Sequence, residues 1–214
     1  MLFAVAGSSQ ATPTVDFLEQ WTASGSLAGW TNAAPYGTGN AVLTNSSGFL
    51  MLSFPAQGMP AVLADTMYGT GTQYSGSFAQ GQLGVRFNFL AEDALPSSSV
   101  LYMHAVSGRE WTYAFDNPAV NVWTMQDVTF DYNFGAGWSG GSQAQFNSDL
   151  SAIDAIGIRI NNRFDYTGQQ DYGLDDWTYY IPEPGTVCLL ASFFLCFGIV
   201  FRRRLPLIFA KPGA

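Results

Sequence analysis

The sequence predicts an all-β protein, an antiparallel β-sandwich that is followed by a single C-terminal transmembrane helix. Between residues 12 and 180, short stretches rich in aromatic and β-branched residues alternate with Gly, Asn, Ser and Pro. This spacing is typical of sandwiches. The run from Gly185 to Phe201 contains no charged residue, and as a helix it would reach about 25 Å, enough to span a membrane.

Alternating apolar and polar side chains predict the individual strands. In the stretch 84–90, Val85, Phe87 and Phe89 would face the core, and Arg86 and Asn88 the solvent. Two further predicted strands, 40–44 and 49–54, flank a four-residue loop, and two others, 100–106 and 110–115, flank a hairpin turn. A long strand or strand pair is predicted at 120–134, and one more strand around 156–160. A short helix is predicted at 147–154, with Asp149 or Ser151 as its N-cap.

The C-terminal segment has three parts in a fixed order. Pro182, Glu183 and Pro184 form an extended triplet, because proline restricts the backbone and lacks an amide donor. The apolar span 185–201 follows, and then the arginine cluster 202–204. By the positive-inside rule, Arg202, Arg203 and Arg204 mark the cytoplasmic end of the span, which places the large N-terminal part on the other side of the membrane.

This order resembles the PEP-CTERM sorting signal of Gram-negative bacteria that make exopolysaccharide. The resemblance covers residues 181–204, and residues 205–214 continue past the arginines as a short cytoplasmic tail. It implies that exosortase recognises Pro182-Glu183-Pro184 and cleaves the chain. The protein would first be anchored in the inner membrane with its domain in the periplasm, and would then reach the cell surface or extracellular matrix.

The N-terminal residues 1–11 are apolar and then small. They look like the second half of a secretory signal peptide, with a cleavage site near Ser9-Gln10-Ala11, although the basic n-region is missing. The alternative is an ordinary first strand. Residues 12–180 would then form one β-sandwich domain, whose size fits a single core.

Cysteine and charge limit the possible partners of this domain. The only cysteines, Cys188 and Cys196, lie in the apolar span, about 12 Å apart on a helix, too far for a disulfide. All 16 acidic residues but only four of the eight basic ones precede Gly185, so this part carries a net charge of −12. Such a domain repels phosphate backbones, which argues against nucleic acid as a partner. The acidity also fits a role in solubility alone.

Both ends of the domain resemble galactose-binding-like jelly rolls and carbohydrate-binding modules. The matching segments are 16–19 with Gly29-Trp30, and 149–160 with 172–177. In these modules the first and last strands lie side by side and often share a structural calcium ion. The resemblance implies that Asp16 or Glu19 together with Asp175 or Asp176 would bind Ca²⁺, an ion that prefers carboxylate oxygens. Solvated strand ends are the alternative.

A glycan is the ligand that this resemblance implies, with the exopolysaccharide as the expected partner. Sugars pack their C–H faces on aromatic rings. Trp138, in the glycine-rich loop 135–141, is the predicted platform, and Trp30 and Trp111 are weaker candidates. For each of them core packing is the alternative, and for Trp123 and Trp177 core packing is the prediction.

An enzyme is the less favoured class. The only histidine, His104, lies on a predicted strand, and no serine stands in a Gly-x-Ser-x-Gly motif. The four Glu residues form no cluster such as jelly-roll glucanases carry, although a carboxylate pair for glycoside hydrolysis can form only in three dimensions. A structural surface or matrix protein without a defined ligand is the third class.

Overall fold

The computed structural model describes residues 13–46, 48–79, 83–135 and 137–181. The predicted signal peptide, the Pro-Glu-Pro triplet, the apolar span, the arginine cluster and the tail lie outside these residues. Within the described part, no helix is both long and apolar enough to cross a membrane.

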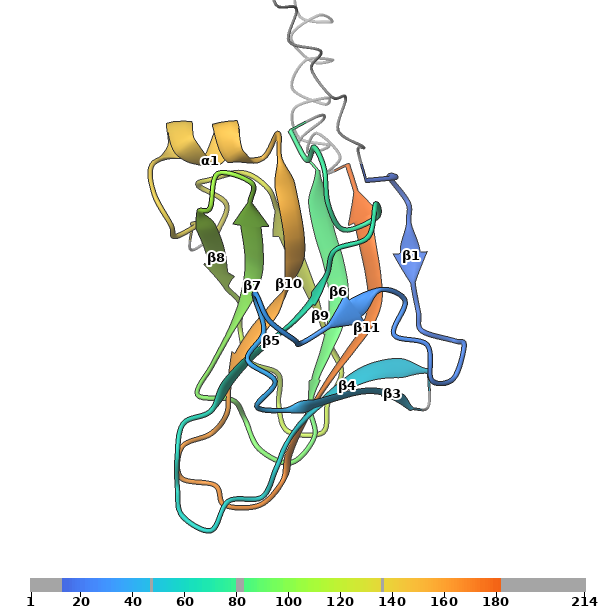
Figure 1. Cartoon of the computed structure of the whole chain (residues 1–214), viewed down its shortest axis with the longest axis vertical. Coiled ribbons are helices and arrows are strands. Elements are labelled where there is room, and N and C mark those ends of the chain that lie inside the picture. The colour runs from blue at the N-terminus through green and yellow to red at the C-terminus, as the bar shows by residue number, and fades with distance from the viewer. Residues whose placement is uncertain (1–12, 47, 80–82, 136, 182–214) are drawn as a thin grey trace, which may run out of the picture. The chain divides into compact units, whose positions relative to one another are not determined.

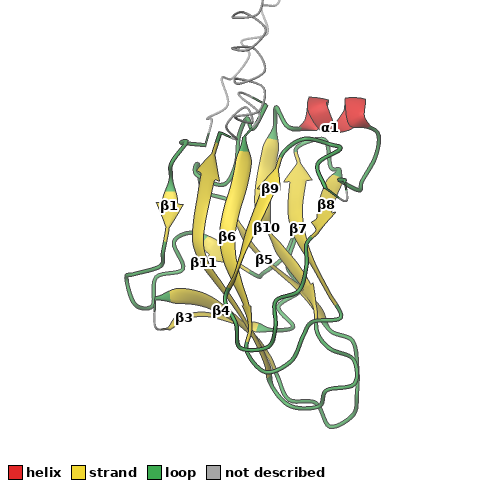
Figure 2. Cartoon of the chain, turned by 180° about the vertical axis from the view of Figure 1, so that it is seen from behind, coloured by secondary structure: helices red, strands yellow, loops and turns green. Residues whose placement is uncertain are grey.

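Two antiparallel sheets face each other across the core, as Figures 1 and 2 show from opposite sides. The first sheet has the order β3-β4-β11-β6-β9, and β1 also pairs with β11. Its strands are β1 (Leu18–Glu19), β3 (Val42–Ser46), β4 (Phe49–Phe54), β6 (Gly84–Ala91), β9 (Thr124–Thr129) and β11 (Gln170–Tyr180). The predicted antiparallel β-sandwich is therefore confirmed.

The second sheet has the order β2-β5-β10-β7-β8. Its strands are β2 (Trp30–Thr31), β5 (Ala64–Gly69), β7 (Ser98–Ala105), β8 (Glu110–Ala114) and β10 (Ile153–Asn161). The predicted hairpin between β7 and β8 is confirmed, and it turns at Gly108, whose φ of 83° suits glycine. Only one helix, α1 (Gln143–Asp149), occurs among the described residues.

The core forms because the strands alternate between buried and solvent-facing side chains. In β6, Val85, Phe87 and Phe89 are fully buried, whereas Arg86 and Asn88 are half-buried on the outer face, as the sequence predicts. The strands of the opposite sheet alternate in the same way and contribute, among others, Leu101, Met103, Ile156, Ile158 and Ile160.

The first and last strands lie side by side, which confirms a second prediction. Leu18 pairs with Thr178, and Glu19 pairs with Trp177. The ladder of β11 is irregular between Asp175 and Thr178, where Asp176 has a φ of 51°. This irregularity lets Asp175 and Asp176 both lie half-buried before Trp177 enters the core.

Three predicted elements differ from the structure. The helix predicted at 147–154 is wrong in position: α1 begins after Ser142, and residues 153–154 already belong to β10. Ser142, not Asp149 or Ser151, is the N-cap, because it forms a capping box with Gln145. The stretch 120–134 contains only the short strand β9, and β3 extends to Ser46, which shortens the predicted four-residue loop.

A buried carboxylate fixes α1 to the second sheet. Asp149, at the end of α1, accepts hydrogen bonds from Arg109 Nη1 at 2.6 Å, Trp111 Nε1 at 2.9 Å and Ser107 Oγ at 2.8 Å. Burial favours the protonated form, but these three donors outweigh it and hold the pKa of Asp149 below its ordinary value. The β7–β8 hairpin and the helix are thus joined through one charged group.

Candidate functional site

Trp138, the predicted glycan platform, is buried, with only 3% of its surface exposed. Its loop folds back over the sandwich, because Trp138 N donates to Tyr132 O and Ser139 pairs with Thr112. The indole packs against Tyr113 and Phe146, with ring centroids 5.6 and 5.2 Å apart. The prediction that Trp138 is exposed at a loop tip is therefore wrong.

The two weaker candidates are also in the core. Trp30 is 2% exposed and packs edge-on against Trp177 at 5.0 Å. Trp111 is fully buried, and its indole N–H donates to Asp149. A sugar stacks only on a ring face that is exposed to solvent. Trp30, Trp111 and Trp138 therefore cannot serve as a glycan platform in this structure.

Trp123 is the exposed tryptophan of the described chain, although core packing is the prediction for it. It is 40% exposed, whereas Trp177, the other predicted core tryptophan, is fully buried as expected. Trp123 directly precedes β9, in which Met125 and Asp127 face outward and Gln126 and Val128 face inward. The two-residue period of a strand therefore places Trp123 on the outer face of the first sheet.

The indole of Trp123 lies over the neighbouring strands. A Cβ atom added to Gly173 on β11 would lie 2.8 Å from Trp123 Cη2, 3.2 Å from Leu90 Cβ and 3.4 Å from Phe49 Cδ2. Phe49, on β4, meets the indole edge-on at a centroid distance of 5.2 Å. The missing side chain of Gly173 thus makes room for the indole. Trp123, Phe49, Leu90 and Gly173 together form a surface patch, which we call the aromatic platform.

Polar groups flank the aromatic platform along β11. Asp171 and Asp175 stand two residues before and after Gly173, on the same face and about 7 Å from it along the strand. Asn88 on β6 is the pairing partner of Asp175 on β11, and its side-chain amide donates to Asp176 Oδ2 at 2.7 Å. Burial raises the pKa of Asp175. An aromatic surface with carboxylates and amides at its rim is the combination that glycan sites use.

The sequence contains one signal for this platform. Asp127 is charged and is expected to face solvent. Trp123 and Met125 precede it by four and two residues, so in a strand they lie on the same face as Asp127. Gly173 stands between Tyr172 and Leu174 in an otherwise bulky strand, and an isolated glycine there indicates close approach of another group. Nothing in the sequence shows that the two features meet.

The predicted calcium ligands on β11 have amide partners. Asp176 Oδ1 accepts from Gln20 Nε2 at 2.8 Å, and Asp176 Oδ2 accepts from Asn88. Asp175 Oδ1 accepts from the backbone N–H of Asp176 at 2.8 Å. Both carboxylate oxygens of Asp176 and one of Asp175 therefore accept from N–H groups of the chain.

At the N-terminal strand, Glu19 Oε1 accepts from Trp21 N at 3.0 Å. The backbone N–H of Asp16, and not its carboxylate, donates to Tyr179 O at 2.9 Å. No group of three His, Cys, Asp or Glu side chains in the described ranges could hold a metal ion. The pairing of the two chain ends agrees with the resemblance.

His104 forms a compact group on the outer face of the second sheet. His104 Nδ1 lies 2.7 Å from Asp154 Oδ1, and Tyr36 Oη donates to Asp154 Oδ2 at 3.0 Å. The rings of Tyr36 and His104 are 4.4 Å apart. Burial, together with the hydrogen bond to Asp154, raises the pKa of Tyr36 to about 12. In the part of the chain that the structure describes, no serine hydroxyl is hydrogen-bonded to this histidine.

Comparison with known proteins gives information on the fold alone. A scan against models of protein families and a search of curated proteins gave no match. Among solved structures, an exo-β-agarase has a TM-score of 0.56 and 11% identity, over 80% of this chain and 25% of that chain. The L4b domain of human laminin α2 has a TM-score of 0.50 and 9% identity, over 71% of this chain and 89% of that domain.

A family 11 carbohydrate-binding module from a Clostridium thermocellum cellulase has a TM-score of 0.47 and 11% identity, over 79% of this chain and 96% of the module. The chain spans about a quarter of the length of the agarase structures that it matches. All these likenesses are far below 25% identity. The agarase and laminin structures, with TM-scores of 0.50 or more, are similar to this chain in fold alone.

Proposed function

We propose that the β-sandwich binds a glycan on the outer face of its first sheet, with the aromatic platform as the contact surface. The observation that carries the proposal is the exposed indole of Trp123, which lies over Gly173 and against Phe49. An indole anchored against Gly173 and Phe49 and still 40% exposed presents apolar area to solvent. The C–H face of a sugar ring covers such an area without losing hydrogen bonds.

The rim of the platform supplies the polar half of this recognition. Asp171 already accepts from Gln169 Nε2 at 3.0 and 2.8 Å, and Asp175 Oδ1 accepts from Asp176 N at 2.8 Å. The remaining lone pairs of both carboxylates can accept from sugar hydroxyl groups on either side of Gly173. Their charges, together with the net charge of −12 before the C-terminal span, favour a neutral polymer over an anionic one, because like charges repel at short range.

Affinity electrophoresis of the purified full-length chain tests this proposal. Gels that contain agarose, laminarin, xyloglucan or mixed-linkage β-glucan should retard the wild-type protein in at least one case. Trp123→Ala should weaken that retention by roughly five- to hundredfold, the cost of about 1–3 kcal/mol for a lost stacking ring. Met125→Ala is the matched control, because Met125 is exposed on the same face but does not belong to the platform. Equal retention of wild type and Trp123→Ala would refute the platform.

We propose binding rather than cleavage, because the platform holds no acid–base pair in contact with the ring face. Incubation with reporter glycosides and with any retarding polysaccharide measures hydrolysis directly. Release of reporter or of reducing ends would assign the protein to the enzymes. A chain that neither binds nor cleaves any polysaccharide would be a structural surface or matrix protein.

The sorting proposal rests on the sequence of residues 182–204. We propose that the protein is exported, held in the inner membrane by residues 185–201 and processed by exosortase at Pro182-Glu183-Pro184. Glu183→Ala should leave the full-length chain in the inner membrane. Surface-released protein that retains Ala214, detected by mass spectrometry, would contradict this order of events.

Calcium binding stays a prediction from the resemblance. An ion that binds only the folded form raises its stability by about 2.7 kcal/mol at a hundred times its dissociation constant. Melting the protein in EDTA and in millimolar Ca²⁺ measures the effect. Equal melting temperatures would remove Ca²⁺ from the account of this protein.

A further inference from the structure

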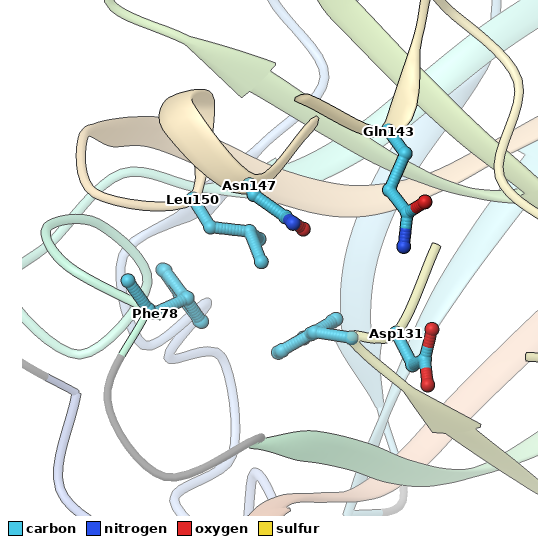
Figure 3. A pocket seen from close by; sticks show the side chains of 7 residues that line it. Phe78, Asp131, Gln143, Asn147 and Leu150 are labelled. Carbon is cyan, nitrogen blue, oxygen red and sulfur yellow. The ribbon is translucent and has the colours of Figure 1, made fainter. Parts of the chain in front are cut away.

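A hollow lies at the end of the sandwich, away from the aromatic platform. It has a volume of about 310 Å³ and lies between α1 and the chain that leaves β9 (Figure 3). Its apolar wall is formed by Phe78, Phe130 and Leu150, and its polar groups are Asp131, Gln143 and Asn147. The volume is at the lower end of the range of about 300–1,000 Å³ that small-molecule sites occupy.

The walls of this hollow are held by interactions outside it. The capping box of Ser142 and Gln145 fixes the start of α1, and the buried ring of Phe146 fixes its middle. Phe78 N donates to Leu150 O at 2.7 Å, which joins the opposite wall to the end of the helix. The rings of Phe78 and Phe130 meet edge-on at 5.4 Å. The hollow is therefore a preformed feature of the fold.

Three polar side chains face this space with complementary chemistry. Gln143 and Asn147 are four residues apart, so both lie on one side of α1. Figure 3 shows the Gln143 amide and the Asp131 carboxylate on opposite sides of the opening. Asp131 Oδ1 accepts from Asn133 N at 3.0 Å. Within the described ranges, neither the Gln143 nor the Asn147 amide has an intramolecular partner, so both are available to a ligand.

We propose that this hollow is a second binding site, which takes a single hydroxyl-rich ring such as one sugar unit or a cyclic polyol. Two amides supply donors and acceptors, and the carboxylate supplies acceptors only, which suits a set of adjacent hydroxyl groups. Phe78, Phe130 and Leu150 form the floor of the hollow and are only 1%, 4% and 6% exposed, so the polar groups carry the recognition of such a ring. An anion is disfavoured by Asp131.

The second site is separate from the aromatic platform. Trp123 lies at the start of β9 and Phe130 directly follows its end, a distance of about 23 Å along the strand. Neither site shares a residue with the other, so each can exist without the other. A polymer that reaches both would be held with greater avidity than by either site alone, because the strand fixes their separation.

Nuclear magnetic resonance of the full-length protein tests the second site with defined probes. Methyl β-D-glucopyranoside, methyl β-D-galactopyranoside and myo-inositol are titrated while the side-chain amide signals of Gln143 and Asn147 are followed. At least one probe should shift both signals saturably, with a dissociation constant in the millimolar range. Cyclohexanol, a ring of similar size with one hydroxyl group, should shift them at least about tenfold more weakly, because it lacks most of the hydrogen bonds.

Variants then assign the effect to the named groups. Asp131→Ala and Asn147→Ala should each raise the dissociation constant about tenfold or more. Ser148→Ala, on the same helix but outside the hollow, and Trp123→Ala, in the platform, should leave it unchanged. If Asp131→Ala fails to fold, Asp131→Asn preserves the shape and removes the charge. No saturable shift with any polyol, an equal response to cyclohexanol, or unchanged binding by the folded Asp131 variant would overturn the second site.

Discussion

The aromatic side chains under α1 and those of the platform are similar in chemistry and opposite in environment. Under the helix, Trp111, Trp138 and Phe146 are covered on both faces and are 3% exposed or less. On the outer face of the first sheet, Trp123 contacts Gly173 and Phe49 but stays 40% exposed.

The comparison teaches that local sequence does not determine the exposure of a tryptophan. Trp138 stands among glycines and is buried, whereas Trp123 stands between Val122 and Thr124 and is exposed. What differs is the packing around each ring. Trp138 contacts the rings of Tyr113, Phe130 and Phe146 and is 3% exposed, whereas Trp123 contacts Phe49 and stays 40% exposed.

The largest expected effect is on the covered side. Trp138→Ala should lower the free energy of unfolding by about 3–5 kcal/mol, because it leaves a cavity among Tyr113, Phe130 and Phe146. Urea denaturation followed by circular dichroism measures this change. Trp123→Ala is the matched control, with an expected loss below about 1 kcal/mol, since its ring is partly solvated in the native state. Equal losses for the two variants would remove the contrast.

The next effect concerns the carboxylate that holds the covered cluster in place. Asp149→Ala should lower the free energy of unfolding by about 3 kcal/mol, because Arg109, Trp111 and Ser107 lose a charged acceptor. The measurement is again urea denaturation, with Asp131→Ala, an exposed acid, as control.

The pH dependence of this contribution has a definite sign. The pKa of Asp149 is lower in the folded than in the unfolded chain, so its stabilisation is complete above about pH 4, the ordinary Asp value. It is lost as the pH falls below that value toward the lowered pKa. The stability difference between wild type and Asp149→Ala should therefore shrink in acid. A difference that stays constant down to pH 2, on the order of two units below the ordinary value, would contradict the assignment.

Fluorescence quenching sharpens the same comparison without disturbing the core. Five of the six tryptophans are 3% exposed or less, and Trp123 is 40% exposed. Acrylamide should therefore quench mainly one component, and Trp123→Phe should remove that component. A retarding polysaccharide should protect it in the wild type. Quenching that survives in Trp123→Phe would show that another indole is open in solution.

The smallest expected effect comes from one methyl group under the platform. Gly173→Ala would place a Cβ atom 2.8 Å from Trp123 Cη2, and the far end of an exposed indole can move aside. We expect a stability change below about 1 kcal/mol together with weaker retention in the polysaccharide gel. Gly108→Ala cannot serve as the control variant for Gly173→Ala, because the positive φ of Gly108 would add backbone strain to the variant. Unchanged retention of Gly173→Ala would mean that the tilt of the indole is unimportant for binding.

Short-range patterns are what the sequence by itself determined. The alternation of Val85, Phe87 and Phe89 with Arg86 and Asn88 predicted a strand and its buried face correctly, because both follow from the two-residue period. The resemblance at the two ends of the domain predicted correctly that the first and last strands pair. The alternation in β6 depends on neighbours only a few residues apart, whereas the pairing of the two chain ends followed from the resemblance.

The tertiary structure alone decided which aromatic rings are exposed to solvent and which carboxylates have hydrogen-bond partners. Residues 132 and 138 fold onto each other and onto α1, a contact between segments whose approach no local pattern records, and so Trp138 became a core residue. Trp123 contacts Gly173, which lies 50 residues later in the chain. Asp176 accepts hydrogen bonds from Asn88 and Gln20, and each of these three residues belongs to a different segment. Exposure and ligand geometry are sums over such distant contacts, so they follow from the packing of the two sheets and not from the residues next to each side chain.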